Sequence, residues 1–214
     1  MMKYSEKQIE SLRLEVGKRL SKKRFKHTIG VEKMAVLIGE RIMPEAISEL
    51  RAAALLHDIS KEYSEAEQIM IMNKHNIELG EGEIFAPALW HSITGPKVIE
   101  EDFPEYASKD VLSSVYNHTV GSPDMSVFDE IVLLSDYIEE GRSYDKCVSL
   151  RDEFLIELQK AKSLEEGIIS LHKAVAKSLD NNIKEFISRG KSYHKRTELT
   201  RDAIYSKIER QNNG

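Results

Sequence analysis

The chain has 214 residues, of which 41% are hydrophobic and 31% are charged, a composition typical of a folded soluble protein rather than a disordered one. Its net charge of −5 argues against general nucleic-acid binding, and its apolar runs are all too short to span a membrane. The single cysteine, Cys147, excludes an internal disulfide framework, and residues 1–16 lack the apolar segment of a secretory signal. We therefore expect a cytoplasmic protein.

Apolar residues recur at helical intervals from the start of the chain. Residues 5–20 are predicted as the first helix, and a second helix begins near Arg24. Pro44 interrupts the pattern and suits the first turn of the next helix, which we expect from Glu45 to about Asp58. The run AAALLHD leaves this third helix little polar face, so it is predicted to lie buried at the centre of the protein.

Cap and turn residues place the helices that follow. Ser64 begins a capping-box sequence and therefore a helix. Residues 76–83 contain two glycines and are predicted as a loop, and a helix is expected from about residue 86 to residue 101. A further helix begins at the capping residue Ser108 and ends near His118, ahead of a Gly-Ser-Pro turn.

The second half of the chain continues the helical pattern. Residues 127–139 form an apolar-striped helix that ends before Gly141. Residues from about 144 to 210 read as two or three more highly charged amphipathic helices, one of which starts at the capping-box Ser163, and the final QNNG is expected to be frayed. We find no sustained period-two alternation, no repeat and no flexible linker, so the sequence predicts an all-α fold with a single domain over residues 1–214.

Six side chains of metal-ligand type lie in the apolar stretches between residues 24 and 140. Four are imidazoles and two are carboxylates: His27, His57, Asp58, His91, His118 and Asp136. Nitrogen and oxygen ligands without a thiolate favour a catalytic iron, manganese or magnesium centre over a structural zinc site. On one helix the adjacent His57 and Asp58 would lie about 100° apart, so both side chains could reach a cation held between helices.

Asp136 has the most informative surroundings of the six residues. It lies among Leu133, Leu134, Tyr137 and Ile138, where a buried carboxylate needs a charge partner that a bound cation would supply. The alternative is a surface position on an amphipathic helix. The remaining histidines occur in polar or C-terminal segments and are assigned no role: His75, His172 and His194.

Several groups near the candidate ligands suit a phosphate. Lys61 lies three residues beyond Asp58, from where its ammonium could reach a phosphate, although a salt bridge is the alternative. Thr119 and Gly121 could offer a hydroxyl and a backbone N–H to an anion, or could form an ordinary helix C-cap. The basic run from Lys18 to Lys26 could steer a phosphate-bearing substrate, or it is a solvated helix end.

The order H…HD…H…H…D resembles the HD-domain superfamily of metal-dependent phosphohydrolases. The longer strings RFKHTIGV, AALLHDISKE, WHSITGP, YNHTVGSPDMS and LSDYIEEGR resemble one branch of it, the YqeK family, whose members hydrolyse dinucleoside tetraphosphates symmetrically. The resemblance covers nearly the whole chain, and its NHTVG and SDYIEEGR strings are the most specific part. It implies an HD-type helical bundle with a metal core at about residues 24–140 and a C-terminal helical extension at about 144–210, packed on the same body.

The resemblance also implies roles for individual residues. The first metal site would consist of His27, His57, Asp58 and Asp136. His91 and His118 would extend it toward a second metal, with Asp58 as the bridge. Iron is the implied metal, as one or two ions, with manganese or magnesium as substitutes. Catalysis would rest on Asp58 and Lys61, and the phosphate path would be lined by Arg24, Lys61, Thr119 and Gly121.

The expected reaction is cleavage of diadenosine tetraphosphate into two ADP molecules. Two alternatives use the same pocket: another nucleotide phosphatase or phosphodiesterase of the superfamily, and a non-catalytic nucleotide-binding regulator. A structural helical adaptor would leave the histidine and aspartate set unexplained. The expected partner is a nucleotide substrate, with no nucleic acid and no membrane, and the resemblance favours a homodimer.

Overall fold

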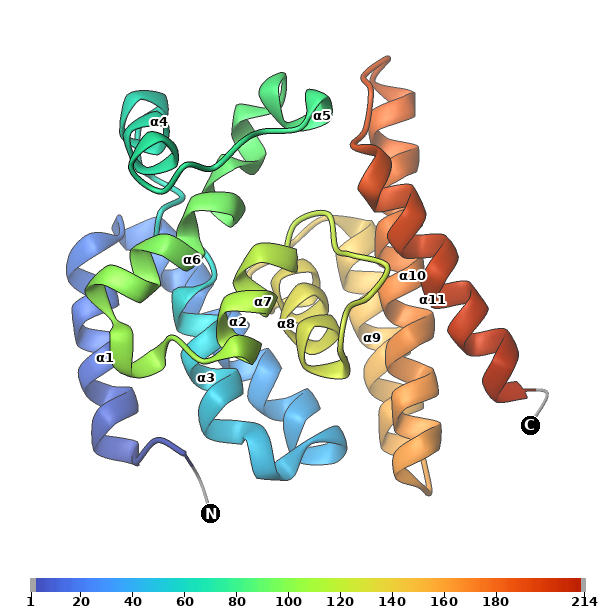
Figure 1. Cartoon of the computed structure of the whole chain (residues 1–214). Coiled ribbons are helices and arrows are strands. Elements are labelled where there is room, and N and C mark those ends of the chain that lie inside the picture. The colour runs from blue at the N-terminus through green and yellow to red at the C-terminus, as the bar shows by residue number, and fades with distance from the viewer. Residues whose placement is uncertain (1–2, 213–214) are drawn as a thin grey trace.

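The computed structural model describes residues 3–212, which contain eleven α-helices and no strand, so the predicted all-α fold is confirmed (Figure 1). In chain order the helices are α1 Glu6–Arg19, α2 Lys22–Ile42, α3 Ile47–Leu56, α4 Glu65–Lys74, α5 Glu81–Ile84, α6 Trp90–Asp102, α7 Lys109–Asn117, α8 Val127–Ile138, α9 Asp145–Lys160, α10 Leu164–Ser188 and α11 Lys195–Asn212. Three short 3₁₀ turns join them: η1 Pro44–Ala46, η2 Pro87–Leu89 and η3 Pro104–Tyr106. Within the described range, no helix is long and apolar enough to cross a membrane.

The third helix is the centre of the core, as its sequence predicts. Figure 1 shows α3 among α1, α2, α7 and α8, and it packs against all four. Its residues Leu50, Leu55 and Leu56 are fully buried, as is the run Ala52–Ala54. The small alanine side chains let neighbouring backbones approach closely, while the leucines fill the space between them. The C-terminal end of this rigid helix positions the candidate ligands His57 and Asp58.

The boundaries of α3 differ from the prediction. Pro44 opens the 3₁₀ turn η1 rather than the α-helix itself, which begins only at Ile47. At the other end, α3 stops at Leu56, so His57 and Asp58 lie in the tight turns that follow it. The backbone there closes i→i+3 hydrogen bonds, including one from the Lys61 N–H to the Asp58 carbonyl at 2.9 Å. These two candidate ligands therefore lie just past a helix end, not inside a helix.

A second difference concerns residues 76–89. Residues 76–83 are predicted as a loop, but the short helix α5 starts within them at Glu81. The helix expected from residue 86 begins only at Trp90, because Pro87 starts the 3₁₀ turn η2 first. A proline at the start of such a turn has no N–H to donate and a φ angle already close to the helical value. This proline-started turn places His91 in the first turn of α6.

Serine caps start several helices, and one of the two predicted capping boxes is incomplete. Ser64 accepts from the Glu67 N–H while the Glu67 carboxylate accepts from the Ser64 N–H, which is the full reciprocal box. Ser163 accepts from the Glu166 N–H at 3.2 Å. The Glu166 carboxylate, however, accepts from the backbone N–H of Lys162 at 2.7 Å rather than from the backbone N–H of Ser163. Ser163 therefore caps α10 without a capping box.

The C-terminal segment forms three helices that pack on the same body. The long helix α10 contacts α2, α8 and α9, and α11 lies along α10 (Figure 1). Of the expected frayed end, Gln211 and Asn212 belong to α11, and residues 213–214 lie outside the described residues. The extension thus packs on both α2 and α8, the helices that carry His27 and Asp136.

A buried ionic cluster ties the extension to α8. Glu130 in α8 is fully buried and its carboxylate faces His172 Nδ1 of α10 at 2.6 Å. Lys207 of α11 donates to the same carboxylate at 2.9 Å and to the Met125 carbonyl at 2.8 Å. A buried carboxylate needs such partners because it has left water. His172, to which the sequence assigns no role, is thus a structural residue.

Candidate metal centre

The six candidate ligands come from five separate parts of the chain and meet at one place. His27 lies in α2, His57 and Asp58 follow α3, His91 begins α6, His118 follows α7 and Asp136 lies in α8. The structure arranges their ligand atoms in two adjoining groups, in each of which those atoms lie within 4.8 Å of one another. His27, His57 and Asp136 form one group, and Asp58, His91 and His118 form the other. The sequence prediction that these residues converge agrees with this arrangement.

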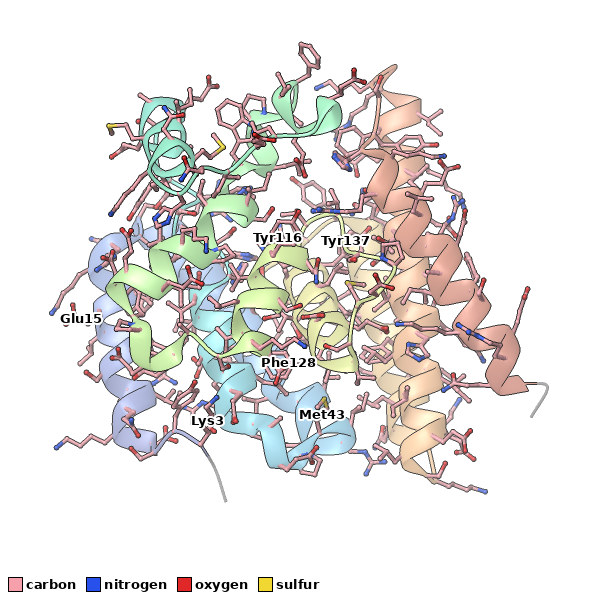
Figure 2. The ribbon with its side chains drawn as sticks, viewed as in Figure 1. Lys3, Glu15, Met43, Tyr116, Phe128 and Tyr137 are labelled. Atoms are coloured by element: carbon pink, nitrogen blue, oxygen red, sulfur yellow. The ribbon has the colours of Figure 1, made fainter. Side chains whose placement is uncertain are left out.

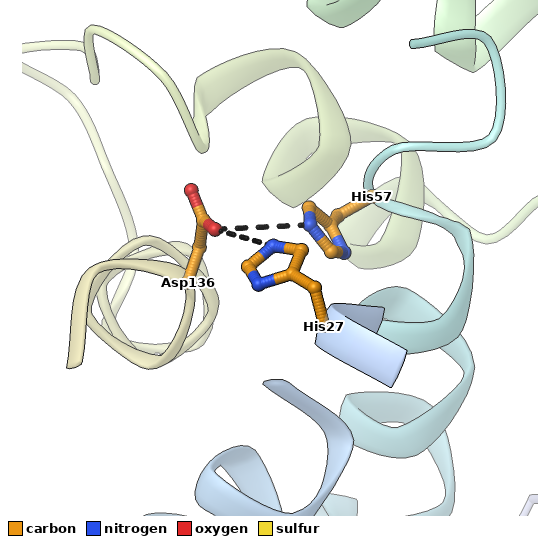
Figure 3. A group of neighbouring side chains, drawn as sticks. All are labelled: His27, His57 and Asp136. Carbon is orange, nitrogen blue, oxygen red and sulfur yellow. Dashed lines mark ion pairs between the residues drawn. The ribbon is translucent and has the colours of Figure 1, made fainter. Parts of the chain in front are cut away.

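The first group is centred on one carboxylate oxygen. Asp136 Oδ1 lies 2.9 Å from His27 Nε2 and 3.9 Å from His57 Nε2. Dashed lines in Figure 3 mark both pairs. The carboxylate of Asp136 is about four-fifths buried, with a side-chain exposure of 21%. Asp136 therefore faces two imidazoles, and its alternative placement as an ordinary surface residue is wrong.

The second group is buried more deeply, and its carboxylate, Asp58, also faces the first group. Asp58 Oδ1 lies 3.2 Å from His91 Nε2 and 3.5 Å from His118 Nε2. The other oxygen, Asp58 Oδ2, lies 3.4 Å from His57 Nε2 and 3.9 Å from His27 Nε2. The two oxygens of one carboxylate thus face different groups, which is the geometry of a bridging ligand.

Backbone and side-chain acceptors orient three of the imidazoles. His57 Nδ1 donates to the Ala54 carbonyl at 2.7 Å, and His118 Nδ1 donates to the Val115 carbonyl at 2.6 Å. A carbonyl can only accept, so in the neutral ring the proton is on Nδ1 and the Nε2 lone pair faces the group. His27 uses Nδ1 in the same way, 3.1 Å from Glu139 Oε1. This outer hydrogen bond is typical of histidines that bind metals.

The protonation states also suit a cation. Burial alone would raise the pKa of Asp58, but the surrounding imidazoles hold it well below its usual value, so Asp58 is ionised. Burial lowers the pKa of His91 to about 4, which leaves this ring neutral near pH 7. Burial opposes a charge on His27, yet the carboxylates of Asp136 and Glu139 raise its pKa to about 9. Without a metal, a proton on His27 neutralises part of the negative charge that a cation would otherwise balance.

The donor set fits a divalent cation. Two buried nitrogens, His27 Nε2 and His57 Nε2, make no hydrogen bond in the structure, although both point at Asp136. Buried nitrogens without a hydrogen bond are destabilising, and a cation that replaced the proton on His27 would satisfy both. Neutral imidazoles together with carboxylates suit iron, manganese or zinc, and the absence of a thiolate from both groups disfavours a structural zinc site.

Two residues that support the ligands were not predicted. Glu139, just after α8, is buried, accepts from the Gly141 N–H at 2.5 Å and orients His27. A methyl group at Gly30 of α2 would overlap this carboxylate. Arg142 donates to Asp136 Oδ1 at 2.6 Å and to the Asp136 carbonyl at 3.0 Å. Both residues belong to the SDYIEEGR string, but their types alone did not separate them from solvent-exposed charges.

The residues expected near a phosphate border the ligand groups. Arg24 Nη1 lies 2.7 Å from Asp58 Oδ2. Lys61 Nζ lies 3.2 Å from each ring nitrogen of His91, and burial lowers the pKa of this lysine. Thr119 Oγ1 lies 3.1 Å from the Ser92 hydroxyl. All three side chains are therefore beside the candidate metal centre.

Gly121 has a clear structural function. Its φ of +70° is in the left-handed region, and its N–H donates to the Asn117 carbonyl at 2.9 Å, as a helix C-cap does. A side chain at this position would also collide with Thr200 of α11. A part for Gly121 in anion binding stays a prediction.

The fold and the ligand arrangement define a class of helical, metal-binding hydrolases. The model of the HD domain family matches residues 24–141, which is more than half of the chain and includes all six candidate ligands. The chain therefore belongs to the HD domain family, and it is a hydrolase of the HD superfamily.

Relatives of known name support the narrower resemblance to the YqeK family. A Bacillus subtilis protein named symmetrical bis(5′-nucleosyl)-tetraphosphatase is 26% identical over 162 residues, covering 74% of this chain and 84% of the relative. A Staphylococcus aureus protein of the same name is 26% identical over 147 residues, covering 66% of this chain and 74% of the relative.

A solved structure matches over almost the full length. The crystal structure of a predicted HD superfamily hydrolase involved in NAD metabolism from Clostridium acetobutylicum has a TM-score of 0.77 and 29% identity. The match covers 97% of this chain and 100% of the other, so it includes the C-terminal helices as well as the metal core.

Proposed function

We propose that the chain is a metal-dependent bis(5′-nucleosyl)-tetraphosphatase that cleaves diadenosine tetraphosphate symmetrically into two ADP molecules. The observation that carries this proposal is the Asp58 carboxylate, whose two oxygens face two groups of imidazoles at 3.2–3.9 Å. A shared carboxylate suits a pair of metals acting on one phosphoryl group. The names of the bacterial relatives supply the substrate.

In this proposal His27, His57, Asp58 and Asp136 hold one metal ion. His91 and His118 hold a second, with Asp58 as the bridge. When bound, the metal, for which we propose iron with manganese or magnesium as substitutes, supplies Lewis acidity and makes water a nucleophile at neutral pH. Asp58 acts as a ligand rather than as a free base, because its surroundings favour the ionised form.

The protein's own cations act on the charge of the polyphosphate, which repels an anionic nucleophile. Lys61 and Arg24 lie beside His91 and Asp58, respectively, where they can bind phosphoryl oxygens and stabilise the charge that develops during attack. Thr119 directly follows the ligand His118 and offers a hydroxyl to the same phosphates. In symmetrical cleavage the bond from the attacked phosphorus to the central bridging oxygen breaks. ADP leaves as a weak base, so little general acid assistance is needed.

The decisive experiment is product identification. The purified protein is incubated with diadenosine tetraphosphate, with added iron or manganese under reducing conditions, and the nucleotides are separated by chromatography. We expect ADP as the only product. ATP together with AMP as products would show asymmetrical cleavage and would contradict the proposal. Phosphate release from mononucleotides without cleavage of the dinucleotide would favour another phosphatase of the superfamily, and binding without turnover would favour a regulator.

Glu139→Gln tests the support of the first metal ion. The amide has the size of the carboxylate but lacks the charge that holds the proton on His27 Nδ1. Loss of such an outer partner typically costs about 10- to 100-fold in metal affinity. We therefore expect metal content after dialysis to fall, with the helical circular dichroism unchanged. Glu140→Gln, its exposed neighbour, is the control and should retain the metal. Equal metal content in both variants would contradict this role.

The cytoplasmic location, the homodimer and the absence of nucleic-acid binding stay predictions. They follow from the composition and the family resemblance.

A further inference from the structure

A large cavity lies next to the metal centre and is not part of it. Its volume is about 710 Å³, within the range of sites that hold a small organic ligand. One wall comes from α5 and η2, and the other comes from the end of α10, the α10–α11 connection and the start of α11. Figure 1 shows α5 and the α10–α11 connection at the same end of the molecule. None of the six candidate ligands lines this cavity.

The cavity borders the residues expected near a phosphate. Thr119, the residue after His118, lines it, and so do Ala88 and Leu89, which shortly precede His91. Lys61 Nζ lies 3.3 Å from the Ala88 carbonyl on this boundary. A molecule whose phosphates reach the metal centre could therefore extend its next portion into the neighbouring cavity.

The C-terminal helices hold the second wall in place. Tyr116 of α7 is labelled in Figure 2. Arg196 of α11 donates to its hydroxyl at 2.7 Å, and the guanidinium lies 4.6 Å from the centre of the tyrosine ring. The Thr200 hydroxyl lies 3.2 Å from the Val120 carbonyl, two residues beyond the ligand His118. A side chain at Gly82 would touch His194, so α5 approaches the α10–α11 connection closely. The extension is thus fastened to the loop that carries a ligand.

The lining has the chemistry of a nucleoside site. Three aromatic side chains contribute to it: Phe85, Phe186 and Tyr193. Phe85 is 87% exposed and Phe186 is 43% exposed, so both rings are accessible to a ligand in the cavity. The Asn182 amide can hydrogen-bond a base edge, and Lys191 adds positive charge. Lys195 also lines the cavity and pairs with Glu198, and Glu81 is the one carboxylate among the lining residues. Nucleobases stack on such aromatic faces regardless of sequence.

We infer that this cavity, between the α5–η2 segment and the α10–α11 connection, binds one nucleoside of the dinucleotide and so determines which phosphorus reaches the metal centre. The inference rests on the proposed function for its substrate class. A nucleoside anchored at one end of the polyphosphate positions every phosphate at a set number of bonds from it. The C-terminal extension would therefore determine which phosphorus atom is attacked, and the HD core would supply the metal ligands.

Binding of ADP and of inorganic pyrophosphate to the full chain tests this inference, measured by calorimetry in the presence of manganese. Phe85→Ala and Phe186→Ala remove the exposed rings with little expected loss of stability. We expect each variant to weaken ADP binding about tenfold, with pyrophosphate binding unchanged. The matched controls are the neighbours Ile84→Ala and Ile187→Ala, which are 49% and 60% exposed and do not line the cavity. The controls should bind both ligands as the wild type does.

Kinetic measurements of diadenosine tetraphosphate hydrolysis distinguish a failure of this inference from a failure of the proposed function. If the wild type converts diadenosine tetraphosphate to ADP, the cavity variants should show a raised KM with a smaller change in kcat. Turnover with wild-type KM and ADP binding in both cavity variants would overturn the nucleoside site alone. Wild-type protein that binds ADP through the two rings but does not cleave the dinucleotide would overturn the proposed function and support the site. Equal affinity of the wild type for ADP and pyrophosphate would overturn the site.

Discussion

Asp58→Asn is expected to abolish hydrolysis and to remove the bound metal. The amide keeps the size of the side chain, but it loses the negative charge and one of the two oxygens that face the separate imidazole groups. Both proposed metal ions depend on this carboxylate, so a single substitution should affect both sites. We expect kcat/KM for diadenosine tetraphosphate to fall by about three orders of magnitude or more, equivalent to about 4 kcal/mol of transition-state stabilisation. Metal analysis of the dialysed protein should show a parallel loss.

The folded state should survive this substitution. Asp58 is surrounded by imidazoles and Arg24, so its replacement by a neutral amide removes charge attraction but leaves hydrogen-bonding capacity. Circular dichroism should show unchanged helix content. Asp102→Asn is the control, because this exposed carboxylate pairs only with Arg19 among the contacts described and lies at the far end of α6 from His91. Wild-type metal content in Asp58→Asn would refute the bridging assignment, whatever the activity.

The helices of this protein could be predicted from the sequence because local signals determine them. Serine caps at Ser64 and Ser108 and the apolar stripe of α8 act within a few residues of the chain. The errors occur where two local rules compete. Pro44 and Pro87 each suit an α-helical first turn, but each starts a 3₁₀ turn instead, which displaces the start of the helix that follows. Helix periodicity does not distinguish these two outcomes.

The candidate ligands could be picked out by residue type, and the residues that contact them could not. Histidine and aspartate in apolar stretches are rare enough to be noticed, because burying them is costly without a partner. Glu139 and Arg142 lie in the charged sequence EEGR, where nothing distinguishes a buried carboxylate from an exposed one. The cavity was beyond sequence reasoning for another reason. Its walls come from segments about a hundred residues apart, and tertiary packing, including that of α11 against the loop after α7, brings them together.

The largest loss of stability is expected from Glu130→Ala. The carboxylate is fully buried and is shared by His172 and Lys207, so the variant leaves two donors without their acceptor. Removal of one partner from a buried ion pair costs about 3–5 kcal/mol. Urea unfolding followed by circular dichroism should show this decrease in the free energy of unfolding. The control Glu153→Ala breaks an exposed pair with Lys177 and should cost less than about 1 kcal/mol.

The two partners of Glu130 should contribute unequally, because they differ in access to water. The Lys207 side chain is 25% exposed, so its ammonium can turn toward solvent when the carboxylate is removed. The His172 side chain is only 5% exposed, so its imidazole cannot turn toward solvent in the same way. Starting from the intact cluster, Lys207→Met should therefore destabilise the protein less than His172→Ala, which also leaves a void between α8 and α10. If Lys207→Met lowered the free energy of unfolding more than His172→Ala, the cluster would stabilise the protein mainly through the ion pair between Lys207 of α11 and Glu130. In that case the position of the C-terminal helix would depend on one charge.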